Sequence, residues 1–247
     1  MRKTLVSGLI ALGAGTAAVG AYLLVFLPWQ RRWGATGEEV QRTLPGDEQI
    51  SHPDTQWTRA ITVKAKASDL WPWLLQIGQG RGGYYSYRWL EKLLGLKVED
   101  ADQINPAWQH LKAGDILPAE PDGSGYRVIT VEPGRALVLG AQEKDEAASR
   151  SFTRLYLAFT WAFVLEEGAH GQTRLITRMR AQTRRSLLAA LAFLFIDFGA
   201  FLLKRRMLLG IKQRAERLCE QAERGAGALS FQPIVGNLRD GRVGGCV

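Results

Sequence analysis

The sequence predicts an α+β fold in which an antiparallel sheet packs against helices on one side. Three features of its pattern lead to this prediction. One strand and two short helices occupy residues 57–95, a run of alternating segments joined by tight turns follows to residue 182, and a long helical stretch covers 186–223. Grouped strands with short turns favour an antiparallel sheet with segregated helices.

The first strand and the two short helices have distinct patterns. WTRAITVKAKAS (57–68) alternates, with Ile61 and Val63 on one face and Thr62 on the other, as in a half-buried strand. DLWPWLLQI (69–77) is predicted to be a helix, and YSYRWLEKLLG (85–95) a second one. Each is followed or ended by a glycine, which is a common helix stop.

The remaining strands are predicted from alternation and turn residues. A short strand ends LKAGDILPA (111–119), and GYRVITVEPGRALVLGAQE (125–143) reads as two strands joined by a Glu-Pro-Gly-Arg turn. RLYLAFTWAFVLEE (154–167) and QTRLITRMRAQ (172–182) form the last pair. About five antiparallel strands therefore lie between the short helices and the long one.

Composition and charge narrow the class of protein. The chain has 247 residues, of which 46% are hydrophobic and 23% charged, as in a globular protein. The net charge of +8 is uneven, because residues 150–247 contain 16 Lys/Arg against 7 Asp/Glu. The basic C-terminal part is suited to phosphates of lipid or nucleic acid. With only two cysteines, Cys219 and Cys246, no disulfide framework is expected. The three histidines are scattered, so no metal site is expected, and no cofactor is expected either.

The N-terminus is predicted to be a membrane anchor, residues 1–33. Residues 4–27 are 24 positions without a charge, and a helix of that length spans ~36 Å against a hydrocarbon core of ~30 Å. A cleaved signal peptide is the alternative, but the apolar run continues through Tyr22–Pro28. Residues 34–56, which are polar and contain Pro45 and Pro53, are predicted to be a linker.

Residues 186–203 are a second apolar segment whose role the sequence leaves open. The stretch 187–203 could be an interfacial or partly buried helix, a second span, or a fully buried start of the long helix. Basic residues flank it, which would suit anionic headgroups, so the soluble domain is expected on the cytoplasmic side. Residues 224–247 are glycine-rich without periodicity and are predicted to be a disordered tail.

A nucleotide-binding fingerprint lies in QIGQGRGG, where Gly78, Gly80 and Gly83 fit G-x-G-x-x-G. A dinucleotide site needs a strand before the glycines and a helix that opens within them. Here a helix precedes them and antiparallel hairpins follow. The glycines are therefore predicted to form a tight turn between two helices.

Several segments in order resemble a known superfamily. They are KAKASDLWPWLLQIGQGRGGYYSYRWLEKLLG, INPAWQHLKAGDILP, the V-x-x-x-x-P-G-R-A-L-V-L hairpin, TRLITRMR and MLLGIKQRAE. Over residues 57–223 the chain resembles the membrane-associated branch of the SRPBCC superfamily, also called START-like or polyketide cyclase/lipid-transport-like. The resemblance implies a helix-grip fold, in which a curved antiparallel sheet wraps a long C-terminal helix over a hydrophobic cavity. It carries over no catalytic residue.

Candidate ligand-binding residues are Trp161, Phe163, Tyr84, Tyr87 and Arg178. Trp161 and Phe163 lie on the apolar face of the longest strand, where they would either line a cavity or form ordinary core. The tyrosines flank the glycine turn, where they would gate a cavity or pack beneath the turn. Arg178 would clamp a carboxylate or phosphate, or else be solvated or paired with an acid.

The function predicted from these features is membrane-anchored binding of a lipid-like or other hydrophobic small molecule, without catalysis and without a cofactor. The alternative is a cyclase- or dehydratase-type enzyme acting on a hydrophobic substrate, which needs a buried ionisable group with a displaced pKa. Binding to nucleic acid is not expected, because no nucleic-acid module is recognisable.

Overall fold

The computed structural model describes residues 13–17, 19–93, 95, 98–148, 156–183 and 187–230, with backbone only for 187–196 and 222–230. The N-terminal part ends in the π-helix η1 (Tyr22–Phe26) and α2 (Leu27–Arg31), followed by α3 (Gly37–Gln41) and the 3-10 helix η2 (Asp47–Ile50). The remaining elements are β1 (Thr55–Val63), α4 (Ala67–Leu75), α5 (Arg88–Leu93), η3 (Pro106–Trp108), β2 (Ile116–Pro118), β3 (Gly125–Glu132), β4 (Ala136–Gln142), β5 (Tyr156–Glu167), η4 (Ala169–Gly171), β6 (Thr173–Thr183) and α7 (Leu187–Ser230).

The six strands form one antiparallel sheet in the order β1-β6-β5-β4-β3-β2, so the first strand pairs with the last. Side chains that are paired across strands share a face of the sheet. Trp57, Met179 and Trp161 pair in one row, and this row defines the inner face, which faces α7. The neighbouring row of Thr58, Arg178 and Ala162 belongs to the outer face.

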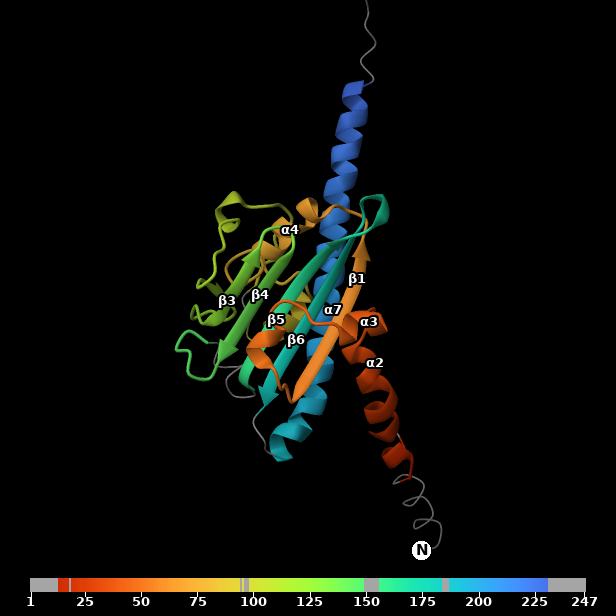
Figure 1. Ribbon diagram of the computed structural model, residues 1–247, viewed down its shortest axis with the longest axis vertical. Helices are drawn as coiled ribbons and strands as arrows, with labels where there is room; N and C mark the ends of the chain where they lie inside the picture. Colours follow the sequence, from red (N-terminus) through yellow and green to blue (C-terminus); the bar gives the residue numbers. More distant parts are fainter. Residues whose placement is uncertain are drawn as a thin grey trace, which may run out of the picture.

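The long helix α7 crosses the inner face and extends beyond the sheet at one end (Figure 1). It packs against α4 and β1. Met207, Leu208, Ile211 and Ala215 are buried at helical spacing along one side of α7, where they join the main core. This arrangement fits a helix-grip α+β fold, and the predicted strands and helices are confirmed to within a few residues at most of their ends.

The glycine-rich stretch forms the predicted turn between α4 and α5. Gly78, Gly80 and Gly83 all have positive φ, a backbone conformation that suits glycine. Gly78 and Gly83 exchange backbone hydrogen bonds, with N–H to O distances of 3.0 and 3.2 Å. A helix, α4, precedes these glycines and another, α5, follows them, so the predicted turn between two helices is confirmed.

The segment predicted to be a linker, residues 34–56, differs from that prediction. It contains α3, whose capping box joins Thr36 and Glu39, and then η2. Leu44 is buried in a second small core against Ala60, Val164 and Ile176 of the outer face. Two of its acids, Glu39 and Asp47, are buried and pair with Arg174 and Arg178 of β6, whereas many of its other polar residues are exposed.

The predicted membrane segments and tail are only partly described. Among the described residues, no helix is both long and apolar enough to cross a bilayer. Residues 4–12 and 18 of the predicted span lie outside the described residues, as do the side chains of 187–196. The helix α7 continues to Ser230, beyond the predicted start of the tail at 224, and residues 231–247 lie outside the described residues.

Candidate ligand-binding site

Aromatic side chains on the inner face form a continuous cluster, which includes two predicted site residues, Trp161 and Phe163. The ring of Trp161 lies 4.8 Å from that of Phe163 and 5.9 Å from that of Tyr126. Tyr126 contacts Phe159 edge-on at 5.5 Å, and Phe159 lies 6.1 Å from Tyr156. The indole Nε1 of Trp161 donates to Thr177. Trp161 is therefore held in one orientation by the sheet, with its ring toward α7.

The two predicted tyrosines lie in different surroundings. Tyr84 packs against the main core, and its hydroxyl donates to the carbonyl of Pro118 at 3.4 Å. Burial raises the pKa of Tyr84, and the charges of Glu91 and Glu120 raise it further. Tyr87 is 36% exposed and lies under the guanidinium of Arg206. Tyr84 therefore belongs to the interior, whereas Tyr87 belongs to the surface.

Arg178 lies on the outer face, so it does not join the aromatic cluster. Its side chain is 2% exposed, and its Nη1 lies 2.6 Å from the carboxylate of Asp47. Its other donors reach the Thr58 hydroxyl and the backbone carbonyls of Glu39, Val40 and Arg42. Arg178 therefore fastens the segment 34–50 to the sheet.

Two cationic residues that were not predicted lie on the inner face. Arg59, on β1, is fully buried, and its Nε donates to the backbone carbonyl of Gln30 at 2.9 Å. Lys204, on α7, places its Nζ 4.2 Å from the ring centre of Trp57 and 5.0 Å from that of Trp161. Arg59 and Lys204 both contact the ring of Trp57, and Lys204 also contacts Trp161 of the aromatic cluster.

The sequence carried a signal for both cations. Arg59 stands two residues before Ile61 in the alternation of β1, so it belongs to the same apolar face. Lys204 stands three residues after Phe201 and four before Leu208, on the buried stripe of α7. A charged residue at an apolar position of a periodic pattern is the informative exception.

One buried acid lies near Tyr84. Glu91, on α5, is 2% exposed, and among the described residues neither carboxylate oxygen has a hydrogen-bond partner. Burial raises its pKa to about 7, the charge of Asp100 raises it as well, and Arg88 opposes both. Glu91 is therefore poised to exchange a proton near neutral pH.

Glu91→Gln is expected to change how stability depends on pH. The folded pKa of Glu91 lies above the ordinary value of 4.5, so the folded state holds the proton more tightly than the unfolded state. The free energy of unfolding of the wild type should therefore fall as pH rises from about 4.5 to 7, and the variant should lack this fall. Urea denaturation at about pH 8 should find the variant more stable by roughly 1–2 kcal/mol. Glu167→Gln, at an exposed position, should track the wild type, and an unchanged pH profile in Glu91→Gln would contradict the assignment.

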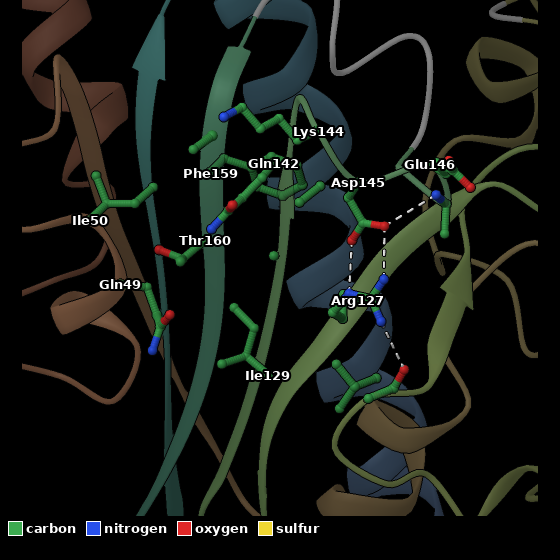
Figure 2. A pocket seen from close by; sticks show the side chains of 16 residues that line it. Gln49, Ile50, Arg127, Ile129, Gln142, Lys144, Asp145, Glu146, Phe159 and Thr160 are labelled. Atoms are coloured by element: carbon green, nitrogen blue, oxygen red, sulfur yellow. Dashed lines mark hydrogen bonds and ion pairs between the residues drawn. The ribbon is translucent and has the colours of Figure 1, made fainter.

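A groove of about 860 Å³ opens on the outer face above β3, β4 and β5, and Phe159 is the member of the aromatic cluster that also lines it (Figure 2). Gln49 and Ile50 of η2 line one side of it, and Arg127 and Asp145 lie at the other. Each nitrogen of the Arg127 guanidinium already donates, two of them to Asp145 at 2.8 Å and one to the carbonyl of Gly114. The charge of Arg127 is therefore neutralised within the fold, and this groove is the weaker candidate.

Comparison with protein-family models finds no match, and comparison with curated proteins finds none. Among solved structures, protein NE0264 from Nitrosomonas europaea is 12% identical, with 68% of this chain and 96% of that chain covered at a TM-score of 0.44. Protein MLL2253 from Mesorhizobium loti is 16% identical, with 66% and 98% covered at 0.38. Ara h 8.0201 is 10% identical, with 65% and 97% covered at 0.37. At identities and TM-scores this low, the likenesses assign neither a ligand nor an activity.

Proposed function

We propose that this chain binds a hydrophobic small molecule between the inner face of the sheet and α7, without catalysing a reaction. The observation that carries the proposal is the ammonium of Lys204, which is held over Trp57 and Trp161 inside an otherwise aromatic interior. Lys204 is partly buried, and a core that served stability alone would gain little from a charge held there, because desolvation of a charge is costly. An apolar site with a few fixed polar groups is the usual form of a small-molecule pocket.

A membrane location is part of the same proposal. So is membership of the membrane-associated SRPBCC branch, which residues 57–223 resemble. It is supported by the uncharged sequence of residues 4–27. The end of this segment lies beside α7, since the ring of Phe26 is 5.8 Å from that of Phe198 and 6.4 Å from that of Phe201. The ligand would then be a lipid-like molecule taken from the bilayer on its cytoplasmic side.

Trp161→Ala is expected to weaken binding of a fluorescent fatty-acid or isoprenoid probe by at least about tenfold, because it removes the ring between Tyr126 and Lys204. The measurement is a fluorescence titration of delipidated full-length protein, which should need detergent for its extraction. Trp89→Ala is the matched control, since Trp89 is 67% exposed. Trp161→Phe keeps a ring in place and should retain most of the affinity, and circular dichroism checks the fold of each variant. Wild-type protein that binds no probe would contradict the proposal.

A second candidate function is supported by Glu91. A buried carboxyl group with a pKa of about 7, close enough to Tyr84 for its charge to raise the pKa of that hydroxyl, has the properties of a general acid–base pair. A dehydratase would use Glu91 to take a proton next to a carbonyl and to return one to the departing hydroxyl as water. Mass spectrometry of hydroxylated hydrophobic ketones incubated with wild type and Glu91→Gln tests this function. If the wild type removes no water, the enzyme hypothesis fails.

A further inference from the structure

The guanidinium of Arg59 is the most incompletely satisfied charged group of the inner face. Arg59 is fully buried, and its Nε donates to the carbonyl of Gln30. Among the described residues, neither Nη1 nor Nη2 has a hydrogen-bond partner. A buried donor without a partner costs roughly 1–3 kcal/mol, and more when it is charged. Nη1 and Nη2 of Arg59 are therefore two adjacent charged donors that are available to a ligand.

Aromatic rings lie over the guanidinium of Arg59, and the edge formed by its Nη1 and Nη2 is buried without a hydrogen-bond partner among the described residues. The carbon at its centre lies 4.4 Å from the ring centre of Trp57 and 5.0 Å from that of Phe201. Such contacts stabilise the cation through its faces, whereas its N–H groups lie in the plane of the guanidinium. The edge formed by Nη1 and Nη2 matches the two oxygens of a carboxylate or phosphate.

The charges around Arg59 do not balance. Lys204 of α7 and Arg31 of α2 are cationic, and Asp197 is the acid whose charge acts on both Arg59 and Lys204. The carboxylate of Asp197 already accepts from Gln30 at 3.1 Å and from Arg31 at 3.4 Å. For Lys204, the acceptor among the described residues is the sulfur of Met179, at 3.4 Å. Around one acid, Asp197, lie the fully buried Arg59 and the partly buried Lys204 and Arg31, so positive charge is in excess here.

Residues 187–196, whose side chains are not described, offer no compensating acid. Their sequence, LLAALAFLFI, is wholly apolar. Of the 24 acidic residues in the chain, all but Glu223 and Asp240 have described side chains. The excess of positive charge is therefore best neutralised from outside the chain.

We propose that Arg59 and Lys204 bind the acidic head of an amphiphilic ligand, a carboxylate or phosphate, while the apolar tail lies along Trp57 and Trp161. This inference rests on the proposed function, because the tail occupies the aromatic site described above. The Arg59 edge binds two oxygens of the head side by side, and the ammonium of Lys204 adds a point charge between head and tail. The ligand class is thus an acidic lipid or a similar single-headed acid.

The affinity for such a ligand should depend on pH. Burial first, and then the charge of Arg59, lower the pKa of Lys204 to about 7, while Asp197 opposes this effect. An acidic head raises that pKa again, so binding takes up a proton above about pH 7 and weakens as the pH rises. Without ligand, the unfolded state holds the Lys204 proton more tightly, so the free energy of unfolding rises from about pH 7 toward 10.5.

The test compares ligands that differ in the head alone. Delipidated full-length protein in detergent is loaded with a neutral fluorescent probe, which is displaced by palmitic acid, hexadecyl phosphate or hexadecanol. We expect the two acids to bind at least about tenfold more tightly than the alcohol. Inorganic phosphate and acetate alone should displace no probe, which separates an acidic lipid from a free anion. The preference for acids should shrink as the pH is raised from about 7 to 9.

Two variants assign the preference to the proposed residues. Arg59→Met and Lys204→Met keep apolar surface and remove charge, so each should lose the preference for acids and keep the affinity for hexadecanol. Arg214→Met is the control, since Arg214 is a cation of α7 that pairs with Asp102 elsewhere. Equal affinity of the wild type for acids and alcohol would overturn this inference while leaving the proposed function standing. If the protein binds neither the probe nor any of the three ligands, both this inference and the proposed function are overturned. If inorganic phosphate alone displaces the probe, the site binds a free anion and this inference is overturned.

Discussion

Replacing Arg178 with methionine is expected to lower the free energy of unfolding by about 3–5 kcal/mol, because it leaves the carboxylate of Asp47 buried without its closest cation. The loss extends beyond one ion pair. The guanidinium also donates to the Thr58 hydroxyl and to the backbone carbonyls of Glu39, Val40 and Arg42. Those carbonyls lie in the segment 34–50, which should detach from the outer face first.

Urea denaturation followed by tryptophan fluorescence measures this effect, and proteolysis at residues 34–50 localises it. Arg127→Met is the matched control, since Arg127 also pairs with an acid but its side chain is 46% exposed. That change should cost less than about 1 kcal/mol. Ligand affinity per folded molecule should stay unchanged in Arg178→Met, because Arg178 lies on the opposite face of the sheet from Trp161. A loss of affinity with unchanged stability would instead restore Arg178 as a ligand residue.

Replacing Gly210 with alanine is expected to cost about 3 kcal/mol of stability. A Cβ at this position of α7 would lie 2.3 Å from the backbone oxygen of Tyr85 and 2.8 Å from its Cβ. Tyr85 offers little room to move, because it is buried, has a positive φ of 55° and donates its backbone N–H to Asp100. Either α7 or the glycine-rich turn must therefore shift.

The same helix supplies the control for this prediction. Gly199 also lies within α7, but nothing lies within 4 Å of the Cβ it would gain. Gly199→Ala should raise stability by about 0.5–1 kcal/mol, since alanine favours a helix over glycine. Thermal unfolding of Gly210→Ala and Gly199→Ala measures these opposite changes in stability. A Gly210→Ala protein as stable as Gly199→Ala would show that α7 does not pack on the turn at this distance.

Most of the strands and helices could be predicted from local sequence patterns. The alternation in 154–167 and 172–182, together with the short turns between strands, predicted β5 and β6 and their pairing, because side chains of a strand face opposite sides with a period of two. The glycine stretch was predicted as an inter-helix turn because a helix precedes it. The segment 34–56 was predicted poorly, since its polar residues lack periodicity and their partners lie more than a hundred residues away on β5 and β6.

The candidate site was predictable in its apolar part and not in its charged part. The alternation of β5 placed Trp161 and Phe163 on one face, and that face proved to be the inner one. The same logic applied to β1 marks Arg59 as a charge on an apolar face, but no pattern in the sequence says whether such a charge finds a partner. Arg178 shows the opposite outcome, because its alternation places it on the outer face, where Asp47 satisfies it.

The sequence by itself determined the order of strands and helices, the tight glycine turn and the aromatic face of the longest strand, because these depend on residues a few positions apart. Only the tertiary structure decided which charges are paired. Arg178 found its acid in a segment that returns over the outer face, whereas Arg59 and Lys204 meet inside the grip with a single acid that is already engaged. Hydrogen bonds and ion pairs act over a few ångströms in space, so residues distant in the chain decide them only once the fold has brought them together.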